Sequence, residues 1–354
     1  MINDSIVITG ASDKAGAGSC KSRGRGLIIN PGALGDVILT LPLAEFMLKA
    51  LNLISVDIMG RRQYVEFIPH RTSVSAIGDI DAVDFHRLFV SETDFRIEEA
   101  ELLVSAFSGY EWIVSFLAEK ESDFEKNLIC TIFSANCAEI SILPMHPLEG
   151  ERIHISEFYI KQFIGENDFE VPDFNLNLKS DLIRPLGTDI EWGKQLMGFS
   201  GVKPDSKTVV IQPGSGGKYK CWHIDNFCSV AVSLGEDGFE PVILLGPAEA
   251  ERFSDSEKQR LGSVGKVISS LNIKQATQLI AASGAYIGND SGTTHLAAGM
   301  GCKTAAIFGP TDANVYGPFG SRTAVIQAGG ESFAQSDEKS QLEVKEAINL
   351  LLND

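Results

Sequence analysis

The hydrophobic positions of this chain form short apolar runs that alternate with longer segments of helical spacing. The runs that predict buried strands in the first half are 27–29, 56–59, 112–117 and 140–143. Those of the second half are 208–212, 241–245, 285–288 and 304–308. Segments with apolar residues at helical spacing are 34–51, 155–164, 224–234 and 341–351. Strands that alternate with helices predict an α/β fold with mainly parallel sheets.

The same pattern occurs in both halves, so we expect two domains. A length of 354 residues agrees, because a domain usually takes about 150 residues. Prolines and glycines around a short helical segment predict a linker at 186–206, between an N-terminal domain at 27–185 and a C-terminal domain at 207–330. Residues 331–354 are expected to form a helix that packs across a domain face. Residues 1–26, rich in Gly, Ser and Ala, are expected to be a flexible extension.

Charge and composition indicate which classes of partner, location and metal site the sequence favours. The chain is 44% hydrophobic and 22% charged, which is typical of a soluble globular protein. Its net charge of -17 argues against nucleic acid as a partner, because phosphate contacts need a basic excess. No apolar run approaches the roughly 18–20 residues of a membrane span, and no apolar secretory signal opens the chain. A cytoplasmic location is therefore expected. No C-x-x-C pair occurs, so no metal site is expected.

Three turns that follow predicted strands carry candidate chemistry, because ligands of open parallel sheets bind beyond the carboxyl ends of the strands. They are Gly35-Asp36, the glycine-rich loop 214–220 and the segment 290–295. In the last, Ser291, Gly292 and Thr293 open a helix, and a helix N-terminus favours a phosphate group. Helix capping by Asp290 or Ser291 explains the segment equally well.

The charged residues of these turns also have two interpretations each. Lys218 or Lys220 could stabilise a diphosphate leaving group or could simply be solvated. Asp36 could be a general base, but a carboxylate at a helix start is favourable without any chemistry. His295 is interpreted as a packed or hydrogen-bonded histidine. The sequence Asp79-Ile80-Asp81 matches a D-x-D metal motif and is interpreted as solvated surface.

Taken in order, the turns resemble the heptosyltransferases of glycosyltransferase family 9. The matching segments are 27–42 (LIINPGALGDVILTLP), 211–216 (IQPGSG) with Lys220 and Trp222, 245–247 (LGP) followed by Glu249, 288–292 (GNDSG) with 295–298 (HLAA), and 308–312 (FGPTD). The resemblance covers the chain from about residue 27 to 320 and is densest in the C-terminal half.

The resemblance implies a GT-B architecture, in which two Rossmann-like parallel-sheet domains face each other across a cleft. It also implies inverting, metal-independent transfer of a sugar, typically heptose from ADP-heptose, to a lipopolysaccharide-core or related glycan acceptor. No cofactor is implied. The partners are the nucleotide-sugar donor and a glycolipid or glycan acceptor at the inner-membrane surface, where the protein would be peripheral.

Site residues follow from the same resemblance. It places the catalytic base on Asp36 and the phosphate-facing lysine on Lys220. The implied donor-binding residues are Gly214, Ser215, Glu249, Leu271, Asp290, Ser291, Gly292, Thr293 and His295. The implied acceptor-binding residues are Gly35, Arg61 and Arg62.

Two other functions stay open: a non-catalytic sugar-nucleotide-binding protein and a two-domain sugar-nucleotide epimerase. The combination of Asp36 with Lys220 favours the transferase, because binding alone would need neither residue. The middle of the N-terminal half has few basic residues apart from Arg61-Arg62 and His70-Arg71. An anionic acceptor and heptose itself therefore do not follow from the sequence, since a shared fold does not determine the sugar.

Overall fold

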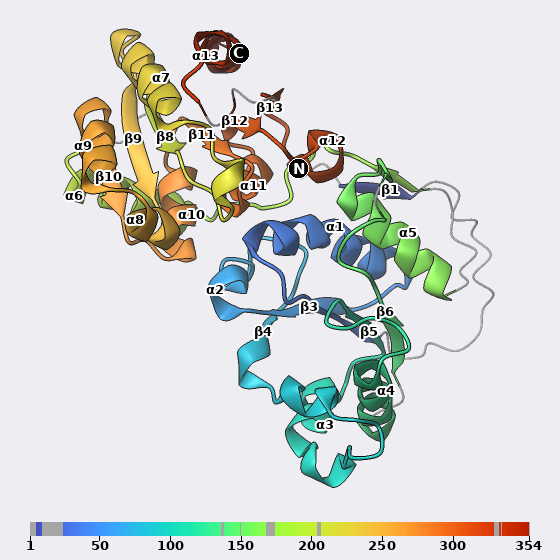
Figure 1. Ribbon diagram of the computed structural model, residues 1–354. Coiled ribbons are helices and arrows are strands. Elements are labelled where there is room, and N and C mark those ends of the chain that lie inside the picture. Colours follow the sequence, from blue (N-terminus) through green and yellow to red (C-terminus); the bar gives the residue numbers. More distant parts are fainter. Residues whose placement is uncertain are drawn as a thin grey trace. The chain divides into compact units, whose positions relative to one another are not determined.

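The computed structural model describes residues 5–8, 24–135, 138–148, 150–167, 174–203, 207–328, 333 and 335–353. These residues form two compact units, an N-terminal one that ends at Asn177 and a C-terminal one that begins at Leu178. Each unit is built on a parallel sheet with helices on its faces (Figure 1). Within the described ranges, no helix combines the length and the apolar character that a membrane span requires.

The N-terminal unit has its parallel sheet in the strand order β4-β3-β2-β5-β6. The strands are β2 (Arg25–Ile29), β3 (Ser55–Gly60), β4 (Ile77–Asp79), β5 (Trp112–Ser115) and β6 (Glu139–Ile142). The helices are α1 (Leu34–Ala50), α2 (Arg62–Val65), α3 (Glu101–Phe107), α4 (Asp123–Ala135) and α5 (Ile155–Asn167). The chain runs outward from β2 to β4 and then returns to β5, so the strand order reverses between β2 and β5. Such a switch point is where parallel sheets bind ligands.

A short antiparallel pair extends the N-terminal unit. Strand β1 (Ile6–Ile8) pairs with β7 (Phe174–Leu176), and Ile6 is buried. Lys49 Nζ on α1 donates a hydrogen bond to the Ile6 carbonyl at 3.0 Å, which ties β1 to the main body of the unit. The ordered fold thus includes residues 6–8 and 25–26, which were expected to lie in a flexible extension. Residues 1–4 and 9–23 of that extension are outside the described residues.

The C-terminal unit has its parallel sheet in the strand order β10-β9-β8-β11-β12-β13. The strands are β8 (Thr208–Gln212), β9 (Glu240–Leu245), β10 (Lys266–Ser269), β11 (Ala285–Asn289), β12 (Lys303–Phe308) and β13 (Thr323–Gln327). The helices include α6 (Gly187–Phe199), α7 (Ile224–Glu236), α8 (Pro247–Arg252), α9 (Asp255–Val264), α10 (Ile273–Ala281), α11 (Gly292–Gly299), α12 (Ala313–Tyr316) and α13 (Glu338–Asn353). Here the strand order reverses between β8 and β11.

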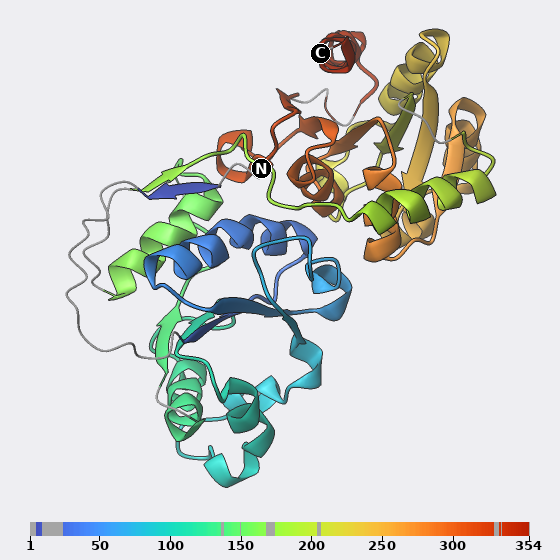
Figure 2. The ribbon, with the colours of Figure 1, turned by 180° about the vertical axis from the view of Figure 1, so that it is seen from behind.

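Helices α6 and α13 both pack onto the C-terminal unit. The predicted linker, 186–206, contains the 13-residue helix α6, which lies against α10 (Figure 2). The packing is close, because a Cβ atom added at Gly193 would lie 1.9 Å from the carbonyl oxygen of Gln278. At the other end, α13 contributes Val344 and Ile348 to the core beside β12. The segment between the predicted domains is therefore part of the second one.

The α6–α10 contact predicts opposite effects for two glycines of the same helix. Gly193→Ala should lower the melting temperature, because overpacking against backbone costs roughly 1–3 kcal/mol or more. Gly198→Ala is the matched control, since a Cβ there meets nothing within 4 Å. It should raise stability by about 0.5–1 kcal/mol, the usual preference for Ala in a helix. Thermal unfolding followed by circular dichroism measures both. Equal melting temperatures for the two variants would contradict the contact.

Candidate active site

The loops after β8 and β11 are joined at the switch point of the C-terminal unit by the side chain of Asn289. This fully buried amide donates hydrogen bonds to the carbonyls of Pro213 at 2.9 Å and Gly214 at 3.3 Å. Its oxygen accepts a hydrogen bond from the Trp222 backbone N–H at 2.9 Å. Ser215 adds a second connection by donating its hydroxyl to the Asp290 carbonyl at 2.6 Å. The glycine-rich loop is thereby held over the end of β11.

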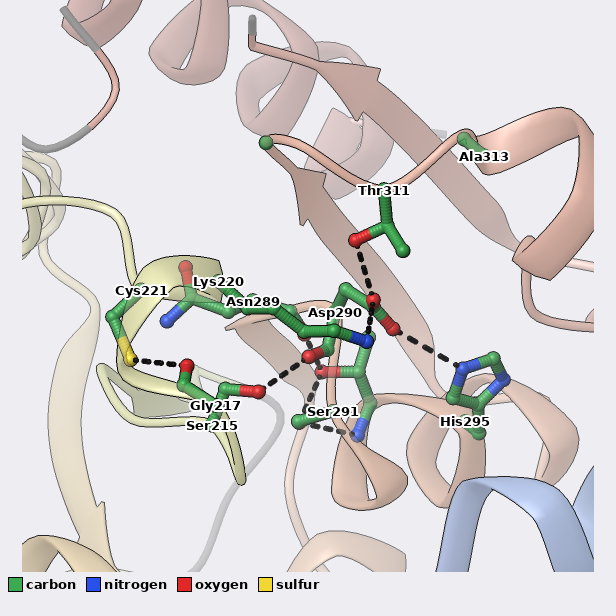
Figure 3. Close-up of polar contacts among 12 residues, drawn as sticks. Ser215, Gly217, Lys220, Cys221, Asn289, Asp290, Ser291, His295, Thr311 and Ala313 are labelled. Carbon is green, nitrogen blue, oxygen red and sulfur yellow. Dashed lines mark hydrogen bonds and ion pairs between the residues drawn. The ribbon is translucent and has the colours of Figure 1, made fainter. Parts of the chain in front are cut away.

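Three side chains converge on the buried carboxylate of Asp290 (Figure 3). Lys220 Nζ lies 2.7 Å from Oδ2, and the Thr311 hydroxyl donates to the same oxygen at 2.7 Å. His295 Nε2 is 3.7 Å from Oδ1. Burial alone raises the pKa of the Asp290 carboxyl, but His295 and Lys220 outweigh it and hold the pKa well below its usual range. Asp290 is therefore an anion that holds Lys220 in place.

Helix α11 begins directly after this carboxylate. Ser291 is its N-cap, and the Ser291 hydroxyl accepts a hydrogen bond from the Thr294 N–H at 3.3 Å. Gly292 and Thr293 are the first two residues of the helix, whose leading N–H groups have no partner within a helix. Gly292 has no side chain to cover them. The helix start and Lys220, whose charge is paired with Asp290, thus offer N–H donors at one place, which suits a phosphate group.

Beneath the helix start lies a polar network that the sequence pattern does not predict. The Tyr286 hydroxyl, fully buried, donates to Gln212 Oε1 at 2.9 Å, and Thr293 bonds to the same oxygen. Burial raises the pKa of Tyr286 to about 12. The Thr294 hydroxyl donates to the Asn289 carbonyl at 2.5 Å. The only sequence signal was that Gln212 and Asn289 are polar residues at the ends of apolar strands.

Glu249 explains why the loop after β8 needs a glycine. Its side chain, on the short helix α8, is buried against the loop, and a Cβ atom at Gly214 would lie 1.8 Å from Glu249 Oε1. Arg252 on the same helix donates to the carbonyls of Ser215 at 2.9 Å and Gly216 at 3.2 Å. Leu271, partly buried, follows β10 at the same edge of the sheet. The residues implied for the donor therefore share one edge of this unit.

Asp36 is the third residue of α1, at the switch point of the N-terminal unit. Its Oδ2 accepts a hydrogen bond from the Ala33 N–H at 2.8 Å, so one carboxylate oxygen caps the helix. A Cβ atom at Gly32 would lie 2.6 Å from the Asp36 Cβ, so the turn needs a glycine there. Asn30 braces the turn by accepting from the Gly32 N–H at 2.8 Å and donating to Thr40 Oγ1 at 2.7 Å.

Other candidates of the N-terminal unit lie around the same edge of the sheet. Gly35 precedes Asp36 in α1, and Arg61 and Arg62 are exposed just after β3. A cavity of about 670 Å³ opens beyond β5 and β6. Its lining is largely apolar, with the charged or polar side chains of Glu119, Lys120, His146, Glu151 and Gln162.

The D-x-D sequence has a structural role. Asp79 Oδ1 accepts a hydrogen bond from the Asp81 N–H at 3.1 Å, which caps the 3-10 turn Ile80–Ala82. In the part of the chain that the structure describes, no three His, Cys, Asp or Glu side chains are grouped so that they could hold a metal ion. The described cysteines are all free thiols: Cys130, Cys221, Cys228 and Cys302.

The sequence of the C-terminal unit matches a known family. Residues 183–345 match the model of glycosyltransferase family 9 (heptosyltransferase). They form a glycosyltransferase family 9 domain. Lipopolysaccharide heptosyltransferase 3 of Escherichia coli K12 is 26% identical over 193 residues, which are 53% of this chain and 53% of that protein. A lipooligosaccharide heptosyltransferase 2 of Campylobacter jejuni is 30% identical over 126 residues, 34% of this chain and 39% of that one. The chain thus spans about half or less of the length of these curated relatives.

Solved structures of a family 9 glycosyltransferase and of a heptosyltransferase share the fold over nearly the whole chain. The family 9 glycosyltransferase of Veillonella parvula has a TM-score of 0.69 at 16% identity, covering 93% of this chain and 97% of its own. The ADP-heptose LPS heptosyltransferase II of E. coli has a TM-score of 0.65 at 17% identity, covering 93% and 98%. The predicted α/β class is confirmed, and the fold is GT-B, with a Rossmann-like sheet in each unit.

The low pKa of Asp290 in the family 9 domain predicts how acid affects stability. A carboxyl whose pKa falls on folding binds fewer protons in the folded state than in the unfolded state. The ionised Asp290 therefore stabilises the fold fully above its ordinary pKa of 3.8, and this stabilisation is lost as pH falls toward the lower pKa of the folded state. Asp290→Asn should therefore cost roughly 1–3 kcal/mol at neutral pH and progressively less in acid. Melting temperatures of both proteins from roughly pH 7 to pH 3 test this. A difference that stays constant with pH would contradict it.

Proposed function

We propose that this protein is an inverting, metal-independent glycosyltransferase that transfers heptose from ADP-heptose to a lipopolysaccharide-core or related glycan acceptor. The observation that carries the proposal is the Lys220–Asp290 ion pair beside the N-terminus of α11, at the switch point of a family 9 domain. The names of its relatives support the sugar and the acceptor class, and the E. coli structure supports the ADP-sugar. Such an acceptor would place the reaction at the cytoplasmic face of the inner membrane.

The donor site in this proposal uses the positive charge at the start of α11. The diphosphate oxygens would accept hydrogen bonds from the N–H groups of Gly292 and Thr293 and from Lys220 Nζ. These contacts strengthen as the bond from the anomeric carbon to the diphosphate oxygen breaks and negative charge grows on ADP. Glu249 would accept hydrogen bonds from the ribose hydroxyls, with the adenine against Leu271. Because protein groups supply this charge, no metal is needed.

On the N-terminal unit, Asp36 would be the general base. Its carboxylate takes the proton from the acceptor hydroxyl while that oxygen attacks the anomeric carbon and ADP leaves, so a single displacement inverts the configuration. One Asp36 carboxylate oxygen accepts the capping hydrogen bond from the Ala33 N–H, and this bond fixes the direction of the second carboxylate oxygen. Gly35, Arg61 and Arg62 would contact the acceptor. The cavity beyond β5 and β6 would take an apolar part of it.

The base is tested with Asp36→Asn. Asn keeps an oxygen that can accept from the Ala33 N–H, so we expect the melting temperature to change little. The rate of heptose transfer from ADP-heptose should fall by roughly 10²–10⁴-fold, the usual contribution of a general base. Donor affinity should stay the same, since the donor residues are on the other unit.

The matched control is Asp189→Asn. Asp189 is the third residue of α6 and accepts from the Leu186 N–H at 2.9 Å, the same capping geometry away from both switch points. It should leave the transfer rate intact. If Asp36→Asn retained near-normal turnover, Asp36 would be a capping residue and the proposed base would be wrong.

The diphosphate contact is tested with Lys220→Ala and Lys218→Ala. A charge-assisted contact is worth roughly 1.5–3 kcal/mol, so Lys220→Ala should lower kcat/KM at least about tenfold. Lys218 is exposed and two residues away, and its loss should have a smaller effect. Assays in EDTA test metal independence, because wild-type transfer should survive the chelator. A larger effect at Lys218, or loss of all transfer in EDTA, would contradict this donor site.

A further inference from the structure

The edge of the C-terminal sheet opposite the candidate active site carries a basic pocket. The active-site loops follow the carboxyl ends of β8 and β11, whereas this pocket is lined by residues at or just before the amino ends of β8, β9, β11, β12 and β13. Its volume is about 600 Å³. Four cationic side chains line it, Lys194, Lys207, Lys303 and Arg322, and none of the described lining residues is acidic. That composition is unusual in a chain with 47 acidic and 30 basic residues.

Two of these cations are held in fixed positions. Arg322 Nε donates to the Gly301 carbonyl at 2.8 Å, and Lys303 Nζ donates to the Leu352 carbonyl at 3.2 Å. Both residues also line a second cavity of about 560 Å³, to which Lys179 contributes and whose described lining again has no acidic residue. Lys303 and Arg322 therefore stand between two adjoining cavities, with further lysines on either side.

Helix dipoles do not neutralise this charge. Helices α7, α10, α11 and α13 end close to the pocket, since Phe239, Ala282, Met300 and Leu352 line it. Each helix C-terminus is worth about half a negative charge. Four ends oppose the four side chains with about -2, which leaves a positive excess among the described lining residues. Asp181, an acidic neighbour of Gly301 that does not line the pocket, accepts hydrogen bonds from the Ser321 N–H and hydroxyl and keeps its negative charge.

We propose that this pocket binds a compound with two or more phosphate groups, independently of the donor site. The adjoining cavities can each take one anionic group, with Lys303 and Arg322 contacting both. A phosphate oxygen accepts several charge-assisted hydrogen bonds, so fixed cations on separate elements suit it better than a single carboxylate. The phosphate groups can come from a free metabolite or from a lipid headgroup, and the experiment below separates these two sources.

The test is isothermal titration calorimetry of the full chain with inorganic tripolyphosphate at constant ionic strength. The pocket variant is Lys194→Gln with Lys207→Gln, which leaves Lys303 and Arg322 in place. The control is Lys266→Gln with Lys274→Gln, two exposed lysines of the same unit outside the pocket. Both doubles remove the same charge. The pocket variant should bind at least about tenfold more weakly, as expected for a lost charge-assisted contact, while the control binds like wild type.

Tripolyphosphate could also occupy the proposed donor site, so Lys220→Ala is titrated in parallel. We expect a binding event that survives Lys220→Ala and is lost in the pocket variant, whether or not the transferase proposal holds. Co-sedimentation with vesicles that contain cardiolipin, whose headgroup carries two phosphates, against phosphatidylcholine vesicles, identifies the source. Pocket-dependent sedimentation indicates a lipid headgroup, and tripolyphosphate binding alone indicates a free compound. Equal weakening in both doubles, or no binding event apart from one removed by Lys220→Ala, would overturn the proposal.

Discussion

The buried amide of Asn289 is the contact on which the candidate active site depends. It lies at the end of β11 and bonds to three backbone groups of the loop after β8. A buried backbone group that loses its partner costs about 1–3 kcal/mol, so these bonds hold the loop in one conformation. That conformation places Lys220 on Asp290 and leaves the start of α11 uncovered. The chemistry of the site therefore rests on a residue that takes no part in it.

Much of the fold follows from local sequence patterns. The run 208–212 coincides with β8, and the runs for β9, β11 and β12 are off by one residue at one end. These strands are buried on both faces, so they are continuously apolar and easy to recognise. Strand β10, with Val267 exposed at a sheet edge, lacks this signal and was missed. Helix α6 was placed in a linker because prolines and glycines flank it, although packing against α10 decides its place.

The candidate site likewise contains some residues that the sequence pattern indicates and others that it does not. Asp36, Lys220 and Asp290 were chosen as candidates because charged residues follow predicted strands at turns with glycine and because those turns resemble family 9. The polar residues around them were not predicted from the sequence. The strand order of the sheet is what brings Thr311, Gln212 and Tyr286 to the site. Tertiary hydrogen bonds between elements far apart in sequence leave no local pattern. From the sequence, helix capping was an alternative to a catalytic role for Asp36. The structure shows that one carboxylate oxygen of Asp36 accepts the capping hydrogen bond.

The two edges of the C-terminal sheet differ in how they present positive charge. In a parallel α/β unit the helices run antiparallel to the strands, so their N-termini lie at the carboxyl edge and their C-termini at the amino edge. At the carboxyl edge, the start of α11 already favours an anion, and a single lysine held by Asp290 would complete the proposed donor site. At the amino edge, the helix ends oppose an anion, so any phosphate site there must rely on side chains. Four cations gather at that edge of an acidic protein, which is the arrangement that the proposed phosphate site would need.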